Sequence, residues 1–150
     1  MLVNSDALRL NFGALLTRDG KHALPMYDFI VGKTFGNLAV DIEFALRRIG
    51  RDWTVGRDDT SLGKALLGNF IYSATDKLNL GLRLDWATGL TYHASKDNYD
   101  ATQKQITVGP QYSFNKEVKL KADYTYMIET SAKEKASKTR TLAVAAVASF

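Results

Sequence analysis

Only one short stretch of the chain brings together residue types that could carry out covalent chemistry. His93 and Ser95 stand two positions apart at the end of an alternating segment, and Asp97 and Asp100 follow them. A histidine can act as general base for a serine hydroxyl, and a carboxylate can orient the imidazole ring. The pattern would suit ester hydrolysis, but we favour the interpretation of His93 as an ordinary histidine at the entrance to a loop. We therefore predict no catalytic residue and no enzymatic activity.

The chain offers no pattern of ligands for a metal ion or a cofactor. His22 lies in a predicted loop, and the short acidic pairs Asp58-Asp59 and Asp97/Asp100 lack the spacing of a calcium loop. Cysteine is absent, which removes disulfides, thiolate metal sites and thiol nucleophiles. We predict no metal site and no cofactor, and we interpret the acidic pairs as solvated turn residues.

A larger group of charged residues alternates with apolar residues along several segments, so that within each segment all of its members stand at odd-numbered or all at even-numbered positions. We call this shared odd or even position their parity. Residues two positions apart lie on the same face of a strand. Charges of both signs on one face can pair across a narrow interior, where an unpaired charge would be costly. The predicted lumen charge network consists of Arg9, Asp41, Glu43, Arg47, Arg83, Asp85, Lys119, Lys121 and Asp123.

Long alternating segments must position these charges, and the stretch from Leu78 to Tyr92 is the clearest of them. Most of its even-numbered positions hold leucine or an aromatic residue, whereas its odd-numbered positions hold polar or small residues such as Arg83. A period of two residues indicates a strand with two unlike faces. A strand of about fifteen residues is long enough to cross a membrane at a tilt.

The same alternation recurs along the whole chain and predicts about eight strands. The second, fourth and sixth connections are tight turns, whereas the first, third, fifth and seventh are longer and polar. Short turns at one rim and long loops at the other are typical of outer-membrane barrels. The predicted segments are Ala7 to Leu16, Met26 to Phe35, Leu38 to Arg47, Lys64 to Ser73, Leu78 to Tyr92, Gln103 to Phe114, Val118 to Glu129, and Thr139 to Phe150.

The tight hairpins repeat at a spacing of about forty residues, which aligns Leu38, Leu78 and Val118. With no helical segment between hairpins, neighbours in sequence can pair all the way round, and we expect the last strand to pair with the first. The predicted fold class is all-β: one domain, residues 1–150, that forms an antiparallel up-and-down transmembrane β-barrel of about eight strands. Pro110 has no N–H to donate, so we expect a β-bulge there.

The orientation of the two faces decides the function, because a soluble lipocalin-like barrel would turn its apolar face inward. Small residues and paired charges on the polar face favour a narrow polar lumen with the apolar face in lipid. A soluble ligand carrier remains an alternative. Aromatic residues at the strand ends predict a membrane girdle: Phe35, Tyr72, Tyr112, Phe114 and Phe150 at the tight-turn rim, and Tyr27, Trp86, Tyr92, Tyr124 and Tyr126 at the long-loop rim.

Composition excludes two further classes of protein. The net charge is +4 at pH 7, but the cations are spread among acids rather than gathered on one face, so we expect no nucleic-acid partner. No apolar run of about eighteen residues occurs, which excludes a helical membrane protein. The chain opens without a basic and apolar leader, so an exported form would be a mature one whose signal peptide has been removed.

The stretch Gly109-Pro110-Gln111-Tyr112 resembles the Gly-Pro-x-Tyr strand that runs to a periplasmic turn in the OmpX/Ail family of small outer-membrane barrels. The OmpA transmembrane domain has a similar architecture. The last strand, which ends in Phe150, looks like the signal that the barrel-assembly machinery recognises. The resemblance implies an eight-stranded barrel in the bacterial outer membrane, with outer-membrane lipids and the barrel-assembly machinery as partners.

A second resemblance concerns the His93/Ser95 pair, which is similar to the His-x-Ser pair of PagL-type lipid A deacylases. In that family the pair lies closer to the C-terminus and is followed by asparagine, where this chain has Lys96. Activity as a lipid A esterase is therefore an alternative rather than the prediction.

Basic residues also gather in two predicted loops, where they could pair with the phosphates and carboxylates of lipopolysaccharide. We predict an outer-membrane β-barrel protein with a structural, surface-interaction or adhesion-type role and a lumen filled by side chains. The alternative is a small pore or porin, such as part of a larger or multichain barrel. The basic loop residues are Arg48, Arg51, Arg57 and Lys64, and Lys133, Lys135, Lys138 and Arg140.

Overall fold

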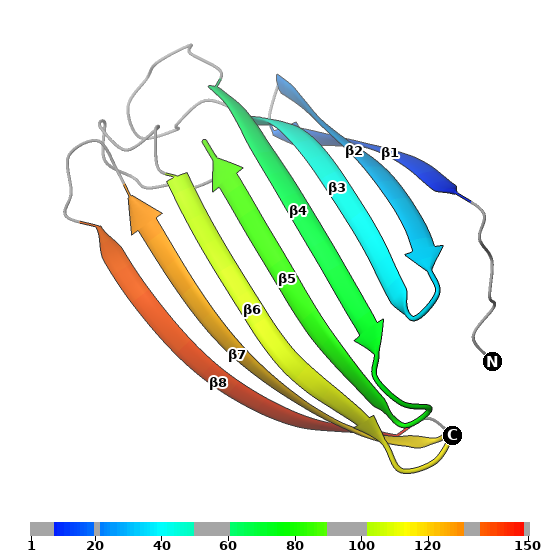
Figure 1. Ribbon diagram of the computed structural model, residues 1–150. Helices are drawn as coiled ribbons and strands as arrows, with labels where there is room; N and C mark the ends of the chain where they lie inside the picture. Colours follow the sequence, from blue (N-terminus) through cyan, green and yellow to red (C-terminus); the bar gives the residue numbers. More distant parts are fainter. Residues whose placement is uncertain (1–7, 20–21, 50–60, 90–101, 131–135, 149–150) are drawn as a thin grey trace.

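The chain forms a single antiparallel sheet of eight strands (Figure 1). The computed structural model describes residues 8–19, 22–49, 61–89, 102–130 and 136–148. Every strand pairs with its neighbours in sequence, which confirms the predicted all-β, up-and-down arrangement. The strands are β1 (Arg9–Asp19), β2 (His22–Phe35), β3 (Leu38–Ile49), β4 (Ser61–Ser73), β5 (Leu78–Thr88), β6 (Thr102–Ser113), β7 (Val118–Thr130) and β8 (Ser137–Ala148). The described part of the chain holds no helix that is long and apolar enough to cross a membrane.

The predicted hairpin repeat is confirmed, because Leu38, Leu78 and Val118 are the first residues of β3, β5 and β7. All three tight turns lie at one end of the sheet (Figure 1). The β2–β3 turn consists of two residues, and its Gly36 has a φ of 56°, a left-handed conformation that glycine adopts at little cost.

The β4–β5 and β6–β7 turns are held by the same hydrogen bonds at equivalent positions. The Thr75 hydroxyl oxygen accepts from the backbone N–H groups of Lys77 (3.2 Å) and Leu78 (3.0 Å). The Asn115 side-chain oxygen accepts in the same way from Glu117 (2.9 Å) and Val118 (2.7 Å). Each short polar side chain therefore satisfies two backbone donors and fixes the register of the strands that follow.

The predicted extent of the first strand was wrong. The first connection is short rather than long, because β1 continues to Asp19 and pairs there with His22, the first residue of β2. Backbone pairing thus extends through polar residues that carry no alternating pattern. The fifth strand has 11 residues and ends at Thr88, while the predicted continuation to Tyr92 lies outside the described residues.

The predicted closure of the barrel is not found. No pairing joins β1 to β8 among the described residues, and the sheet curves into an open trough with these two strands at opposite edges (Figure 1). Alternation assigns residues to faces, but the curvature of a sheet depends on the twist and coiling between neighbouring strands. The edge strands are accordingly exposed: all of β8 is solvent-accessible, and Leu142 is 73% exposed.

Pro110 interrupts the β6–β7 ladder without the predicted bulge. Val108 pairs with Tyr124 and Gln111 with Lys121, so the register is unchanged and neither strand contains an extra residue. A β-carbon added at Gly109 would collide with the carbonyl oxygen of Ala122, so the absence of a side chain permits this close approach.

The sheet is a single layer, and nothing within the described residues covers either face. Ala45 and Ala65, which are Cα partners on β3 and β4, are the buried apolar side chains of this part of the chain. A sheet in a water-soluble domain buries one face against another layer. The apolar face of this sheet instead lies open to its surroundings.

Candidate functional site

The strand register assigns the two kinds of side chain to opposite faces of the trough. Across β5 and its neighbours, Leu80, Leu84 and Trp86 lie on the outer face and are each more than a third exposed. Gly81 and Arg83 lie on the concave face, where polar and small residues of the other strands join them. The alternation seen in the sequence therefore holds over most of the sheet, with Ile30, Leu67 and Ile71 as apolar residues that also line the concave face.

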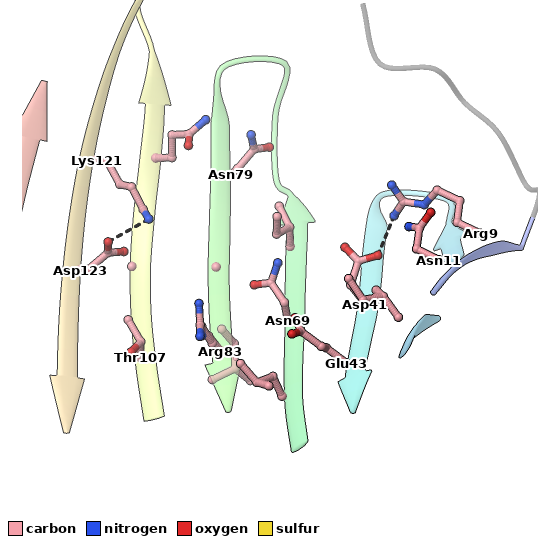
Figure 2. A pocket seen from close by; sticks show the side chains of 17 residues that line it. Arg9, Asn11, Asp41, Glu43, Asn69, Asn79, Arg83, Thr107, Lys121 and Asp123 are labelled. Atoms are coloured by element: carbon pink, nitrogen blue, oxygen red, sulfur yellow. Dashed lines mark hydrogen bonds and ion pairs between the residues drawn. The ribbon is translucent and has the colours of Figure 1, made fainter. Parts of the chain in front are cut away.

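The concave face contains a hollow of about 620 Å³ that is lined mainly by polar side chains (Figure 2). Its walls come from β1 to β7, so it follows the inside of the trough rather than a gap between two strands. The polar residues that line it are Arg9, Asn11, Asp41, Glu43, Asn69, Asn79, Arg83, Thr107, Gln111, Lys121 and Asp123.

Most of the predicted charge network meets in this hollow. Arg9, Asp41, Glu43, Arg83, Lys121 and Asp123 line it together. Of the remaining predicted residues, Asp85 bonds to Arg83, Lys119 lines a second hollow beside the tight turns, and Arg47 has the same parity as Asp41 and Glu43. Six of the nine predicted residues thus line one hollow on the concave face.

One ion pair joins two strands that are not neighbours in the sheet. The Arg9 Nη2 atom lies 2.8 Å from the Asp41 Oδ1 atom, which joins β1 to β3 (Figure 2). Gly32 of β2 is the Cα partner of both residues. A β-carbon at Gly32 would run into the Asp41 carboxylate and approach the guanidinium, so this glycine makes room for the pair.

The other ion pairs of the hollow run along strands, and here the prediction was wrong. Charges on the polar face were expected to pair across the interior, but the Arg83 Nε atom lies 2.8 Å from the Oδ1 atom of Asp85 on β5 itself. Asp85 also accepts a hydrogen bond from the Gln105 side-chain amide of β6 at 3.1 Å. Lys121 and Asp123 pair along β7 at 2.9 Å. Residues two apart in a strand share a face, so these contacts need no cross-strand reach.

The ion pairs are open to solvent rather than enclosed. The side chains of Arg9 and Arg83 are 55% and 52% exposed, while that of Asp85 is 17% exposed. Ion pairs with this degree of exposure contribute about 0.2–1 kcal/mol each. The network therefore stabilises the sheet little, but it holds charges of both signs in fixed places along the hollow.

The uncharged lining residues were missed by the sequence analysis. Asn11 and Asn79 have the same parity as the predicted network residues of β1 and β5, so a signal for these two was present. Asn69 and Gln111 had no such signal, because the charged residues of their strands, Lys64 and Lys104, have the opposite parity. Their amide groups both donate and accept hydrogen bonds. The hollow can consequently bind water or a polar solute without preference for one sign of charge.

The predicted girdle residues within the described part of the chain lie outside this hollow. Phe35, Tyr72 and Tyr112 are exposed beside the tight turns, and Phe114 packs edge-on against Tyr112 with ring centroids 5.1 Å apart. The girdle residues predicted for the long-loop rim do not all lie at that rim, since Tyr124 is at the middle of β7.

Two further girdle residues contact cations or other rings. The Arg140 guanidinium lies 5.8 Å from the centre of the Tyr126 ring, and Tyr27 stacks on Phe12. Trp86 is exposed near the end of β5. Tyr92 and Phe150 lie outside the described residues.

The residues considered for catalysis, and the acidic pairs considered for metal binding, lie outside the described part of the chain. His93, Ser95, Asp97 and Asp100 fall within 90–101, outside the described ranges, as do the acidic pair 58–59 and four of the eight basic loop residues. The other four, Arg48, Lys64, Lys138 and Arg140, lie in strands β3, β4 and β8 rather than in loops. His22, predicted in a loop, begins β2 instead. Within the described ranges, no three acidic or histidine side chains gather as a metal site would require.

Comparison with known proteins found no similarity on which an assignment could rest. No protein-family model matches the chain, and no curated protein or solved structure resembles it significantly. The resemblance to the OmpX/Ail family and to the OmpA transmembrane domain therefore stays a prediction.

Proposed function

We propose that this chain is a bacterial outer-membrane protein whose sheet forms the wall of a transmembrane barrel around an aqueous lumen, so that it acts as a pore for small polar solutes. The observation that carries this proposal is the division of the sheet into an exposed apolar outer face and a solvated, charged concave face. A lipid-facing barrel wall alternates in just this way.

The outer face supports the lipid side of the proposal. Leucines, phenylalanines and tyrosines lie exposed along it on every strand from β1 to β7, and nothing within the described residues covers them. Exposed apolar patches larger than a few hundred Å² are uncommon on soluble monomers. In a bilayer the same residues would contact acyl chains at no cost.

The two open edges favour a barrel wider than eight strands. Unpaired N–H and C=O groups on β1 and β8 cannot remain exposed to hydrocarbon, so in a membrane both edges must pair. The shallow curvature of the trough leaves β1 and β8 apart (Figure 1). Additional strands, from a longer chain or from further copies, would complete the wall at this curvature and leave the hollow filled with water.

A second candidate keeps the smaller barrel, with a structural, surface-interaction or adhesion-type role. Pairing of β8 with β1 would close eight strands around a lumen just wide enough for side chains to fill. The Arg9–Asp41 pair favours this candidate, because it bridges β1 and β3 over Gly32 of β2, and side-chain pairs of this kind would fill a narrow lumen. Closure would require the trough to curl further than it does.

Partners and location follow from the same proposal. The outer face would contact outer-membrane lipids, the Lys-rich and Arg-rich loops would contact lipopolysaccharide phosphates, and the C-terminal strand would be recognised by the barrel-assembly machinery. No nucleic-acid partner and no cofactor form part of the proposal.

Planar-bilayer recording of the refolded full chain tests the function, after cell fractionation has placed the exported protein in the outer membrane. Stepwise channels of reproducible conductance are expected. A protein that reaches the outer membrane and folds, yet leaves the bilayer silent, would replace the pore with the plugged barrel. A protein that stays soluble without detergent would overturn both candidates.

A further inference from the structure

A second hollow, of about 710 Å³, opens where the trough meets the tight turns. It lies on the concave face at the ends of β5, β6 and β7, beyond Asn79 and Gln111 of the first hollow. Its charged lining residues differ from those of the first hollow, because Lys77, Lys116 and Lys119 stand against a single described carboxylate, Asp76.

The lysines are placed by the strand register. The Ser113 backbone N–H donates to the Lys77 carbonyl oxygen at 2.8 Å, and Ser113 is the Cα partner of Lys119. Lys77, which directly precedes β5, therefore forms one row with Ser113 of β6 and Lys119 of β7. Strands lie about 4.8 Å apart, so the two lysine backbones flank the small serine at a separation of about 10 Å.

The next row supplies neutral donors. Asn79 and Gln111 are Cα partners, and Gln111 pairs in turn with Lys121. The Lys121 ammonium is engaged by Asp123 at 2.9 Å, which leaves the amides of Asn79 and Gln111 as the polar groups of this row that line both hollows. Side-chain amides and a serine hydroxyl can each donate a hydrogen bond to an oxyanion.

We propose that these residues form a binding site for the phosphate or carboxylate group of a small anionic solute, at the tight-turn mouth of the trough. Two lysines whose backbones flank Ser113, with a third lysine on the β6–β7 turn, all line this hollow and suit an anion with several oxygens. The first hollow carries both signs of charge, so the excess of cations at this mouth would set an anion preference. The site deepens the proposed pore function, since it requires a water-filled concave face.

Titration with inorganic phosphate tests the site without any need for conduction. Backbone amide NMR signals of the full chain, refolded in zwitterionic detergent, should shift at Ser113, Lys119 and the two turns. Lys77→Gln combined with Lys119→Gln should weaken phosphate binding about tenfold or more, because two charge-assisted contacts are lost. Lys33→Gln is the matched control: Lys33 stands near the same rim on the outer face, over the Phe35 ring.

Channel recording across a potassium chloride gradient provides the second readout. The wild-type channel should favour chloride, the double variant should lose that preference, and the Lys33 control should keep it. A silent bilayer with intact phosphate shifts would overturn the pore and leave the site standing.

Three results would overturn the site. They are phosphate shifts absent from wild type, equal weakening by the Lys33 control, and shifts produced only by vesicles of phosphatidylglycerol and not by inorganic phosphate. The last result would mean that the lysines bind lipid headgroups rather than a solute.

Discussion

The two faces of the same strands differ in what they require from their neighbours. On β5, the outer residues Leu80 and Leu84 contact no covering layer, whereas Arg83 on the concave face pairs with Asp85. The outer face thus depends on the surrounding medium, and the concave face supplies partners for its own charges. A sheet with an apolar medium on one side and water on the other is expected to show this difference between its two faces.

The first and largest test places a charge on each face. Leu84→Arg should cost about 2–4 kcal/mol of folding free energy in lipid, because the outer face at this depth would lie in hydrocarbon. Urea titration of the refolded protein in liposomes measures it. Asn69→Arg is the control, since Asn69 lies on the concave face as the Cα partner of Asp41 and should cost less than about 0.5 kcal/mol. Equal losses from the two variants would mean that the faces do not differ in their surroundings.

A second test compares two glycines of the concave face. Gly109→Ala should destabilise the protein by about 1–3 kcal/mol, because the new methyl group meets the Ala122 carbonyl oxygen and the backbone must shift. Gly81→Ala should be nearly neutral, since the nearest atom to its β-carbon is a carbonyl oxygen at 3.4 Å. The same urea titration measures the folding free energy of both variants. Similar losses would mean that the close approach of β6 and β7 at Gly109 does not explain the requirement for glycine there.

The smallest expected effect concerns the Arg9–Asp41 pair. A double-mutant cycle with Arg9→Gln and Asp41→Asn should give a coupling free energy of about 0.2–1 kcal/mol, the range for solvent-exposed ion pairs. A coupling of several kcal/mol would indicate a dry interior and would favour the closed, plugged barrel over the pore.

Much of the fold could be predicted because strand alternation is local. Leu38, Leu78 and Val118 were placed correctly at the starts of strands, since a tight turn and a period of two residues are both visible in sequence. Closure was predicted wrongly, because curvature arises from twist accumulated over many strand pairs. The bulge at Pro110 was predicted wrongly because the ladder can lose pairs without gaining a residue.

The sequence predicted that the charged residues share one face of the sheet, but it did not predict the contacts among them. Parity predicted that Arg83 and Asp41 share a face, and both line the hollow of the concave face. The partner of Arg83 depended on side-chain reach along β5, and the Arg9–Asp41 contact depended on the space left by Gly32. The alternation of polar and apolar residues determines neither of these two contacts.

Accessibility of single cysteines along β5 tests most directly the claim that one face meets lipid and the other meets water. The chain contains no cysteine, so each introduced thiol carries the sole label. In liposomes, a fluorophore at Leu80→Cys, Leu82→Cys or Leu84→Cys should be quenched by nitroxide on lipid acyl chains and protected from iodide. A fluorophore at Gly81→Cys or Arg83→Cys should show the opposite pattern. Iodide quenching of the leucine positions, with protection at Gly81 and Arg83, would contradict the account and place the apolar face inside a soluble or inverted barrel.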